Sequence, residues 1–278
     1  MNKKKLTIVL SSLFLLLFLS GCSNSSELIS LSTPISDVKA DGFLTVILTY
    51  PLAQAINYLS VHVGVFWAIT IVTLVLNAII LALTFKSNVA MQKMQEVQPE
   101  IQKIQLKYEG RTDSASQQKA AMEMQKVYAK YNINPMTSML ATFIQFPILI
   151  SMYAAVRRSA EVKNGSFFGY SLDLTPREAF VEHAWILIVI FVLMIVFQLL
   201  SVSIVKWLDN SRAKKEADKH HKHYEKPKDN TTFMTYGMTA FIGVIMLSWP
   251  TALSLYYCIY SVINIVKSIV IDKMSHKD

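Results

Sequence analysis

Hydrophobic residues fall into six runs along the chain, and polar residues gather between them. The first run, from Leu6 to Leu19, directly follows Lys3, Lys4 and Lys5. The later runs are long enough, at about 20 residues, to cross a hydrocarbon core of roughly 30 Å. They span 61–85, 135–156, 183–205, 233–249 and 251–271. The pattern predicts an all-α polytopic membrane protein with five transmembrane helices.

The periodicity changes between the first and second long runs, in segment 86–134. Apolar residues recur there at intervals of three and four, with Gln, Glu and Lys between them, as in amphipathic helices. They are Met94, Val97, Ile101 and Ile104, followed by Ala120, Met124, Val127 and Tyr131. Gly110 breaks the pattern, and Ser114 with Gln117 indicates a capping box at the next helix. We predict a two-helix hairpin, whose surface either docks a partner or is simply solvated. The candidate docking residues are Met94, Val97, Ile101, Met124 and Val127.

The N-terminus has the form of a lipoprotein signal. Residues 1–21 combine lysines, an apolar run and small residues before Cys22, whose thiol is the expected lipid acceptor. The other interpretation is an uncleaved anchor with a chance cysteine. Residues 22–42 are then an extracytoplasmic tether, and 43–60 an amphipathic helix at the interface. Because Cys258 is the only other cysteine and lies in an apolar run, no disulfide framework is expected.

Basic residues set the expected orientation. The net charge is +8, and Lys and Arg concentrate in 86–134 and in 206–232, so both segments are predicted to be cytoplasmic. Segment 157–182 balances its basic residues with acidic ones and is placed outside, and the short tail 272–278 is placed inside. His220, His221 and His223 lie among lysines without the spacing of a metal site, so no metal or cofactor is predicted.

Several short motifs resemble the YidC/Oxa/Alb family of membrane protein insertases. The residues that carry the resemblance are Tyr50-Pro51-Leu52, Met91 to Glu100, Asn134-Pro135, Gln145-Phe146-Pro147-Ile148-Leu149, Phe168 to Leu174 and Pro250 to Tyr257. Their order and spacing follow the family across nearly all of the expected mature chain. The resemblance implies a helical bundle around a polar groove that is open to the cytoplasm. It also implies a function in inserting and folding membrane proteins without catalysis.

The same resemblance implies the partners of the chain. These are nascent membrane proteins, the phospholipid bilayer, the Sec translocon and the ribosome. The lipoprotein signal adds a covalent diacylglycerol at Cys22. The resemblance also places the protein in the bacterial cytoplasmic membrane as a multi-pass lipoprotein. The mature N-terminus would be extracytoplasmic and the C-terminus cytoplasmic.

One departure from the family lies in the first span. The family usually has an arginine there, nine residues before a lysine at the membrane boundary, and counting back from Lys86 gives Asn77. Asn77 is therefore either interhelical packing or part of a polar, uncharged groove. The other candidate lining residues are Gln145, Gln198, Tyr257, Ser261 and Asn264. The last three share one helical face, since they lie at i, i+4 and i+7.

Two other functions fit the same residues. A paralogue that has lost its charged groove would act as an assembly scaffold rather than an insertase. A channel or transporter is a weaker interpretation, because neither an inverted repeat nor paired intramembrane charges are visible in the sequence.

Overall fold

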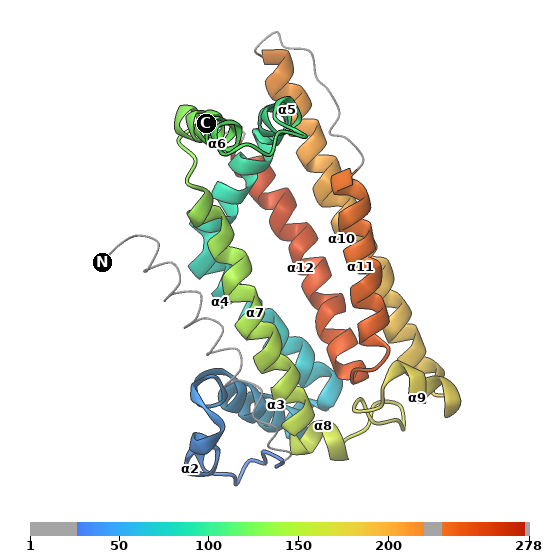
Figure 1. The fold of residues 1–278 in the computed structure, drawn as a ribbon. Coiled ribbons are helices and arrows are strands. Elements are labelled where there is room, and N and C mark those ends of the chain that lie inside the picture. The colour runs from blue at the N-terminus through green and yellow to red at the C-terminus, as the bar shows by residue number, and fades with distance from the viewer. Residues whose placement is uncertain (1–26, 220–229, 276–278) are drawn as a thin grey trace. The chain divides into compact units, whose positions relative to one another are not determined.

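A computed structural model describes residues 27–219 and 230–275, and most of this part is helical (Figure 1). The elements are α2 (Ile35–Val38), η1 (Lys39–Asp41), η2 (Thr45–Thr49), α3 (Tyr50–Val63), α4 (Val65–Glu96), α5 (Gln98–Lys107), α6 (Ser114–Lys130), α7 (Pro135–Arg158), α8 (Ala160–Asn164), α9 (Pro176–Val181), α10 (Trp185–Lys219), α11 (Asn230–Met246) and α12 (Thr251–Ser275). The chain divides into two compact units. Of the described residues, the cap unit comprises 27–75, 144–193 and 245–259, and the hairpin unit comprises 76–143, 194–219, 230–244 and 260–275.

Three stretches are long and apolar enough to cross a membrane: Val65–Met91 in α4, Trp185–Leu208 in α10 and Thr251–Lys273 in α12. α7 is a further helix of 24 residues, and α11 contains the shorter apolar stretch Thr235–Met246. The predicted all-α polytopic fold is confirmed. That α7 and α11 also cross, for five crossings in total, stays a prediction.

Two helices continue well beyond their apolar runs. The run expected to end at 85 belongs to a helix that ends at Glu96, and the run expected to end at 205 belongs to one that ends at Lys219. Neither extension contains glycine or proline, so nothing in it interrupts the backbone hydrogen bonds. The end of an apolar run therefore does not mark the end of the helix that contains it.

In the cap unit, the segment after the expected lipidation site is packed rather than extended away from the protein. The sequence predicts a tether over 22–42, whereas residues 27–42 include α2 and η1 and bury Ile29 and Val38. The helix expected over 43–60 corresponds to the π-turn η2 followed by α3, and its interfacial position stays a prediction. Gly64, with φ of +82°, ends α3 and lets α4 begin in a new direction.

The loop between α7 and α10 is fixed to the start of α12 within the cap unit. Thr251 donates from its backbone nitrogen and from its hydroxyl to the carbonyl of Leu174, at 2.9 and 2.6 Å. The Ala252 nitrogen donates to the carbonyl of buried Leu172 at 2.9 Å. These bonds satisfy amides that an α-helix leaves unpaired at its N-terminus. The turn at Pro250, which precedes α12, is thereby joined to the loop between α7 and α10.

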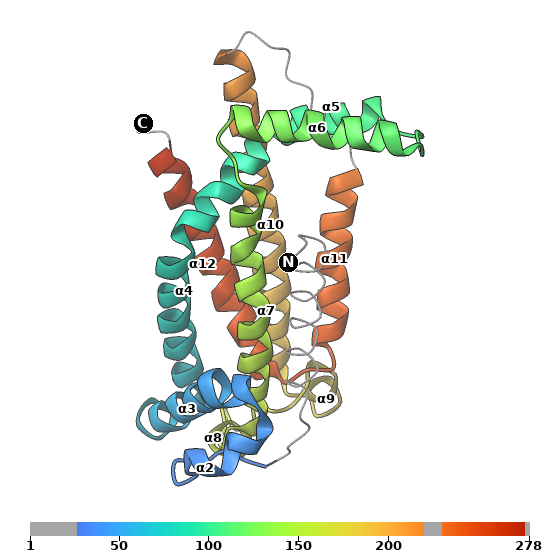
Figure 2. The same cartoon turned by 60° about the vertical axis from the view of Figure 1, so that its left-hand side comes forward.

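In the hairpin unit, α5 and α6 form the predicted two-helix hairpin (Figure 2). Val97, Ile101 and Ile133 form its buried centre. Partly buried side chains that pack on this centre are Met94, Met124, Val127, Tyr128 and Tyr131. The apolar spacing in the sequence thus identified the packing residues, apart from Ile133, which lies beyond the second helix.

The tip of the hairpin differs in one detail from its prediction. Gly110, with φ of +79°, lies in the turn as expected. The cap of α6, however, is Asp113, whose carboxylate accepts from the Ser116 nitrogen at 2.8 Å, and not Ser114. Aspartate and serine are both favoured caps, so two adjacent candidates could not be separated from the pattern alone.

Candidate functional site

The residues predicted to line a groove fall into both units. Asn77, Gln198, Ser261 and Asn264 belong to the hairpin unit, whereas Gln145 and Tyr257 belong to the cap unit. The two groups are therefore described separately, and a groove that combines them stays a prediction.

In the hairpin unit, two polar pairs connect α12 with α10. The Ser261 hydroxyl donates to Gln198 Oε1 at 2.6 Å, and Asn264 Nδ2 donates to the Ser201 hydroxyl at 2.9 Å. Ser261 and Ser201 are buried. Such bonds between membrane helices stabilise their association by about 1 kcal/mol each. These predicted lining residues thus already contribute to helix packing.

Asn77 is part of a polar stripe along α4. Its side chain is 6% exposed, and buried Thr84 and Asn88 follow seven and eleven residues later on the same helical face. Asn88 Nδ2 donates to the carbonyl and to the hydroxyl of Thr84, at 2.9 and 3.0 Å. Asn77 is the member of this stripe that places a side-chain amide within the predicted span 61–85, where it interrupts the apolar run. The spacing of seven and four residues identifies Thr84 and Asn88 as its companions.

Lys267 in α12 was overlooked, although it lies inside the predicted fifth span. It is half-buried, three residues after Asn264 and four before buried Ile271, so the three side chains share one face. Exposed Val262 and Val266 mark a different face of the same helix. A lysine at such a position is costly in hydrocarbon and is a functional candidate. A basic side chain therefore lies within a predicted span of the hairpin unit, beside candidate lining residues that are otherwise uncharged.

In the cap unit, Gln145 lies near Tyr256, the neighbour of the candidate lining residue Tyr257. Its Nε2 atom lies 3.5 Å from the hydroxyl of Tyr256, at the limit of a hydrogen bond. Tyr256 is fully buried, whereas Tyr257 is partly exposed and packs edge-on against Tyr256 with 5.4 Å between ring centroids. The polar contact of α7 thus involves Tyr256, and Tyr257 remains a candidate for lining.

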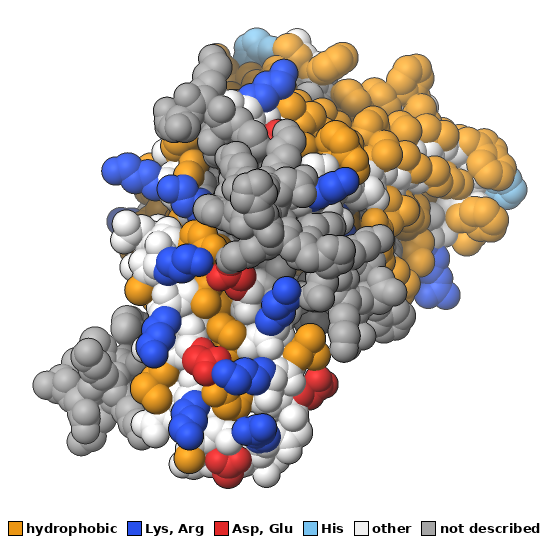
Figure 3. Space-filling model, turned by 90° about the horizontal axis from the view of Figure 1, so that it is seen from above, with side chains coloured by type: hydrophobic (Ala, Val, Ile, Leu, Met, Phe, Trp, Pro, Cys, Tyr) orange, Lys and Arg blue, Asp and Glu red, His pale blue; other side chains and the backbone are white. Residues whose placement is uncertain are grey.

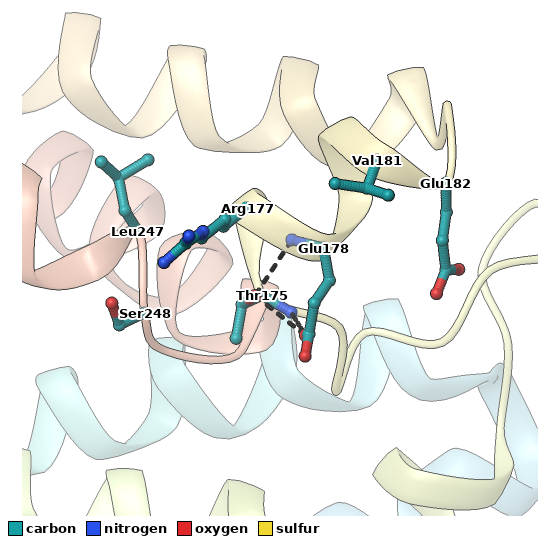
Figure 4. A pocket seen from close by; sticks show the side chains of 7 residues that line it. All are labelled: Thr175, Arg177, Glu178, Val181, Glu182, Leu247 and Ser248. Carbon is teal, nitrogen blue, oxygen red and sulfur yellow. Dashed lines mark hydrogen bonds between the residues drawn. The ribbon is translucent and has the colours of Figure 1, made fainter.

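A surface cavity of about 450 Å³ lies between α9 and the turn before α12, also in the cap unit (Figure 4). Its lining residues are Thr175, Arg177, Glu178, Val181, Glu182, Leu247 and Ser248. Thr175 and Glu178 form a complete capping box at the start of α9. Hydrogen bonds from the Thr175 nitrogen and hydroxyl hold the pKa of Glu178 below its ordinary value. The Glu178 carboxylate is therefore already engaged in capping α9.

The hairpin surface mixes charges of both signs. Figure 3 shows Lys and Arg side chains interspersed with Asp, Glu and apolar groups on the face that contains the hairpin. Exposed basic residues of α5, α6 and the turn between them are Lys103, Lys107, Arg111, Lys119, Lys126 and Lys130. Of the predicted docking residues, Val97 and Ile101 are buried inside the hairpin. They hold it together, so a partner would contact the exposed positions.

Comparison with known proteins identifies the family. The family model described as 60Kd inner membrane protein matches residues 57–278, most of the chain. The chain belongs to this family. Its members include the YidC insertases, so the family predicted from the motifs is confirmed. Family membership and the apolar helices make the chain a multi-pass membrane protein.

Three relatives illustrate the match to this family. The membrane protein insertase YidC of Oceanobacillus iheyensis is 28% identical over 276 residues, which cover 98% of this chain and 97% of that protein. The YidC of Enterococcus faecalis is 34% identical over 62% of this chain and 60% of its own length. MisCA of Bacillus subtilis is 31% identical over 61% of this chain and 63% of its own length. The last two matches thus span less than two thirds of the relatives.

Two features of the sequence analysis lie outside the described residues. They are the signal with Cys22, and the histidines 220, 221 and 223. Lipidation at Cys22 therefore stays a prediction.

Proposed function

We propose that this chain is a membrane protein insertase that helps integral membrane proteins enter the bilayer and fold there. The observation that carries this proposal is the alignment over almost the full length of both chains with a relative whose name states that activity. The buried polar stripe of Asn77, Thr84 and Asn88 on α4 supports it. These residues place amides and a hydroxyl on one face of a helix that contains a long apolar stretch.

The proposed mechanism lowers a solvation barrier. A polar group costs several kcal/mol in hydrocarbon when it has no hydrogen-bond partner. A hydrated groove, open to the cytoplasm, shortens the distance over which a polar segment of the substrate is unsolvated. The proposed lining is Asn77, Gln145, Gln198, Tyr257, Ser261 and Asn264. Lys267 adds a positive charge one turn before Ile271, towards the predicted cytoplasmic end.

Orientation and partners follow from the charge distribution. The hairpin and the segment after α10 are proposed to face the cytoplasm, and the cap unit to face outwards. Exposed aromatic side chains of the cap unit suit an interfacial position at the outer face. They are Phe43, Tyr58, Trp67, Phe168, Phe180 and Trp185. Nascent membrane proteins would be the substrates, with the Sec translocon and the ribosome as partners at the hairpin and a diacylglycerol at Cys22.

A second candidate is a scaffold that assembles membrane complexes without inserting proteins. The observation that favours it is the pairing of Ser261 with Gln198 and of Asn264 with Ser201. Polar groups that bind each other have less capacity to hydrate a passing segment. Asn77 in place of the usual arginine points in the same direction.

Complementation separates the two candidates. The chain is expressed in a bacterium depleted of its own insertase, and growth is measured together with insertion of a small reporter membrane protein. An insertase should restore both, whereas a scaffold should restore neither at an equal membrane level. Quantifying the protein in the membrane fraction ensures that a failure does not reflect poor expression.

A further inference from the structure

One face of α3 presents three hydrogen-bond donors to the backbone of the segment that precedes it. Tyr50, Gln54 and Asn57 lie at i, i+4 and i+7, so they form one stripe along the helix. Their acceptors are the main-chain carbonyl oxygens of Thr33, Ser30 and Ile29, at 2.9, 2.8 and 2.6 Å respectively. The stripe thus recognises backbone rather than side chains.

The junction of α7 and α8 provides a second set of backbone contacts. The Ile29 nitrogen donates to the Arg158 carbonyl at 2.6 Å, and the Ala160 nitrogen donates to the Ile29 carbonyl at 3.0 Å. Together they form a parallel bridge between Ile29 and Ser159. This is how a protein binds an extended peptide by strand addition, in which main-chain bonds give affinity.

Only one side chain of residues 27–31 is enclosed. Ile29 is 0% exposed, whereas its neighbours Leu28 and Leu31 are 40% and 50% exposed. Peptide sites of this kind take specificity from a pocket for one side chain and tolerate variation beside it. The site therefore fits an extended segment with one aliphatic residue.

Two residues of the site, Asn57 and Arg158, also bind polar groups elsewhere in the cap unit. Asn57 Oδ1 accepts from the Ser159 hydroxyl at 2.6 Å and from the Glu161 nitrogen at 3.3 Å, which fixes the amide that donates to Ile29. Arg158 pairs with Asp41 at 2.8 Å and donates from Nε to the Glu27 carbonyl at 3.0 Å. The contacts to the segment are thus preorganised, which reduces the entropic cost of binding.

We propose that the cap unit contains a peptide-binding site, formed by Tyr50, Gln54, Asn57 and the α7–α8 junction. Its resident ligand is residues 27–33 of the same chain, and this ligand is exchangeable for another extended peptide that presents an aliphatic side chain. A covalently linked ligand has a high effective concentration, so an outside peptide binds well only when the resident one is weakened. The inference does not rest on insertase activity, since binding is measured directly.

The site can be tested by binding a fluorescent peptide, with the sequence of residues 27–41, to the full chain in detergent. Binding is measured by the fluorescence anisotropy of the peptide. Ile29→Asp places a charge where the enclosed side chain lies, so the resident segment should leave the site. The variant should bind the peptide at least about tenfold more tightly than the parent, because the resident segment no longer competes. A peptide with aspartate in place of Ile29 should not bind. Leu31→Asp is the matched control, and it should behave like the parent because Leu31 is exposed.

A second variant keeps the test decisive if Ile29→Asp fails to fold. Ile29→Ala removes most of the enclosed side chain from the resident segment without adding a charge and leaves the site residues unchanged, so it should also admit the peptide. Adding Gln54→Leu should then weaken peptide binding severalfold, because a donor to the bound backbone is lost. Equal peptide binding by the parent and both variants, or binding by neither folded variant, would overturn the proposal.

Discussion

The cap unit and the hairpin are stabilised in opposite ways. In the cap unit, Arg158 and Asp41 pair at 2.8 Å with side chains 9% and 13% exposed, and buried Asn57 makes three hydrogen bonds. In the hairpin, Lys107 and Glu123 pair at 2.7 Å with side chains 58% and 33% exposed, around a small apolar centre. Buried polar contacts are costly to break, whereas exposed pairs contribute little and are screened by salt. We therefore expect a rigid cap and an adaptable hairpin.

The largest effect should come from breaking the buried pair of the cap. Arg158→Met removes the positive charge that pairs with Asp41 in a poorly solvated position, which should cost about 3–5 kcal/mol. The melting temperature of the full chain in detergent should fall by roughly ten degrees. Arg157→Met is the control, since Arg157 is exposed and donates to the Tyr153 hydroxyl. If both variants melt alike, the cap is not held by the buried pair.

A smaller effect is expected in the hairpin. Ile101→Asp puts an unpaired charge into its apolar centre and should cost about 3 kcal/mol, enough to disorder α5 and α6. The membrane helices should still insert, so limited proteolysis should cut the hairpin while the protein level in the membrane is unchanged. Leu106→Asp, at an exposed site of α5, is the control. Loss of the whole protein from the membrane would show that the hairpin is not adaptable.

The same contrast explains which features the sequence could predict. The hairpin centre depends on local spacing, so Val97, Ile101, Met124 and Val127 could be identified from periodicity. The cap depends on main-chain bonds between distant residues, such as Ile29 with Arg158. A backbone carbonyl is present at every residue and leaves no pattern, which is why residues 27–42 were predicted as a tether.

The candidate lining shows a similar division. Polar residues in apolar runs are visible in sequence, so Gln198, Ser261 and Asn264 were found. The hydrogen bonds that join Ser261 and Asn264 of α12 to α10 were not predictable. Periodicity gives the face of a helix on which a residue lies, but not the helix that packs against that face. Lys267 was visible but was overlooked, because the fifth run is apolar enough to remain a span despite one charge.

The next effect concerns Asn77, within the hairpin unit. If Asn77 keeps a groove hydrated, Asn77→Leu should impair insertion more than Asn77→Arg, since leucine removes the polar group. If Asn77 only packs, the ranking should invert, because an arginine costs about 2.5–3.5 kcal/mol near the centre of a span. The measurement is complementation at matched membrane levels. Equal activity of Asn77→Leu and the parent would refute a working groove at this residue.

A few-fold, substrate-dependent effect is expected at Lys267. Lys267→Gln should reduce insertion of a reporter with acidic residues in its translocated part more than that of a neutral reporter, because opposite charges attract strongly in a poorly solvated site. Lys273→Gln is the matched control, since Lys273 is exposed on the same helix. An equal loss for both reporters would indicate a role in packing or stability instead.

The smallest effect should come from the exposed pair of the hairpin. Hydrogen bonds from Lys107 and from Tyr108 hold the pKa of Glu123 below its ordinary value of 4.5, and the bond to Glu123 holds the pKa of Lys107 above 10.5. The carboxylate therefore stabilises the hairpin above pH 4.5, and this contribution is lost as the pH falls through the lowered pKa. The lysine contributes below pH 10.5, and its contribution is lost as the pH rises through the raised pKa.

Hydrogen exchange of α5 and α6 should therefore stay constant at intermediate pH, after correction for intrinsic rates, and accelerate on the acid side. Both partners are well solvated, so the acceleration should be slight and should disappear at high salt. Glu123→Gln should reduce it, whereas Glu109→Gln, at an exposed residue near the turn, should not. An acceleration at acid pH that is unchanged in Glu123→Gln would assign the whole pH dependence to the Asp113 cap. The pKa of Asp113 is likewise lowered, by its bond from the Ser116 nitrogen.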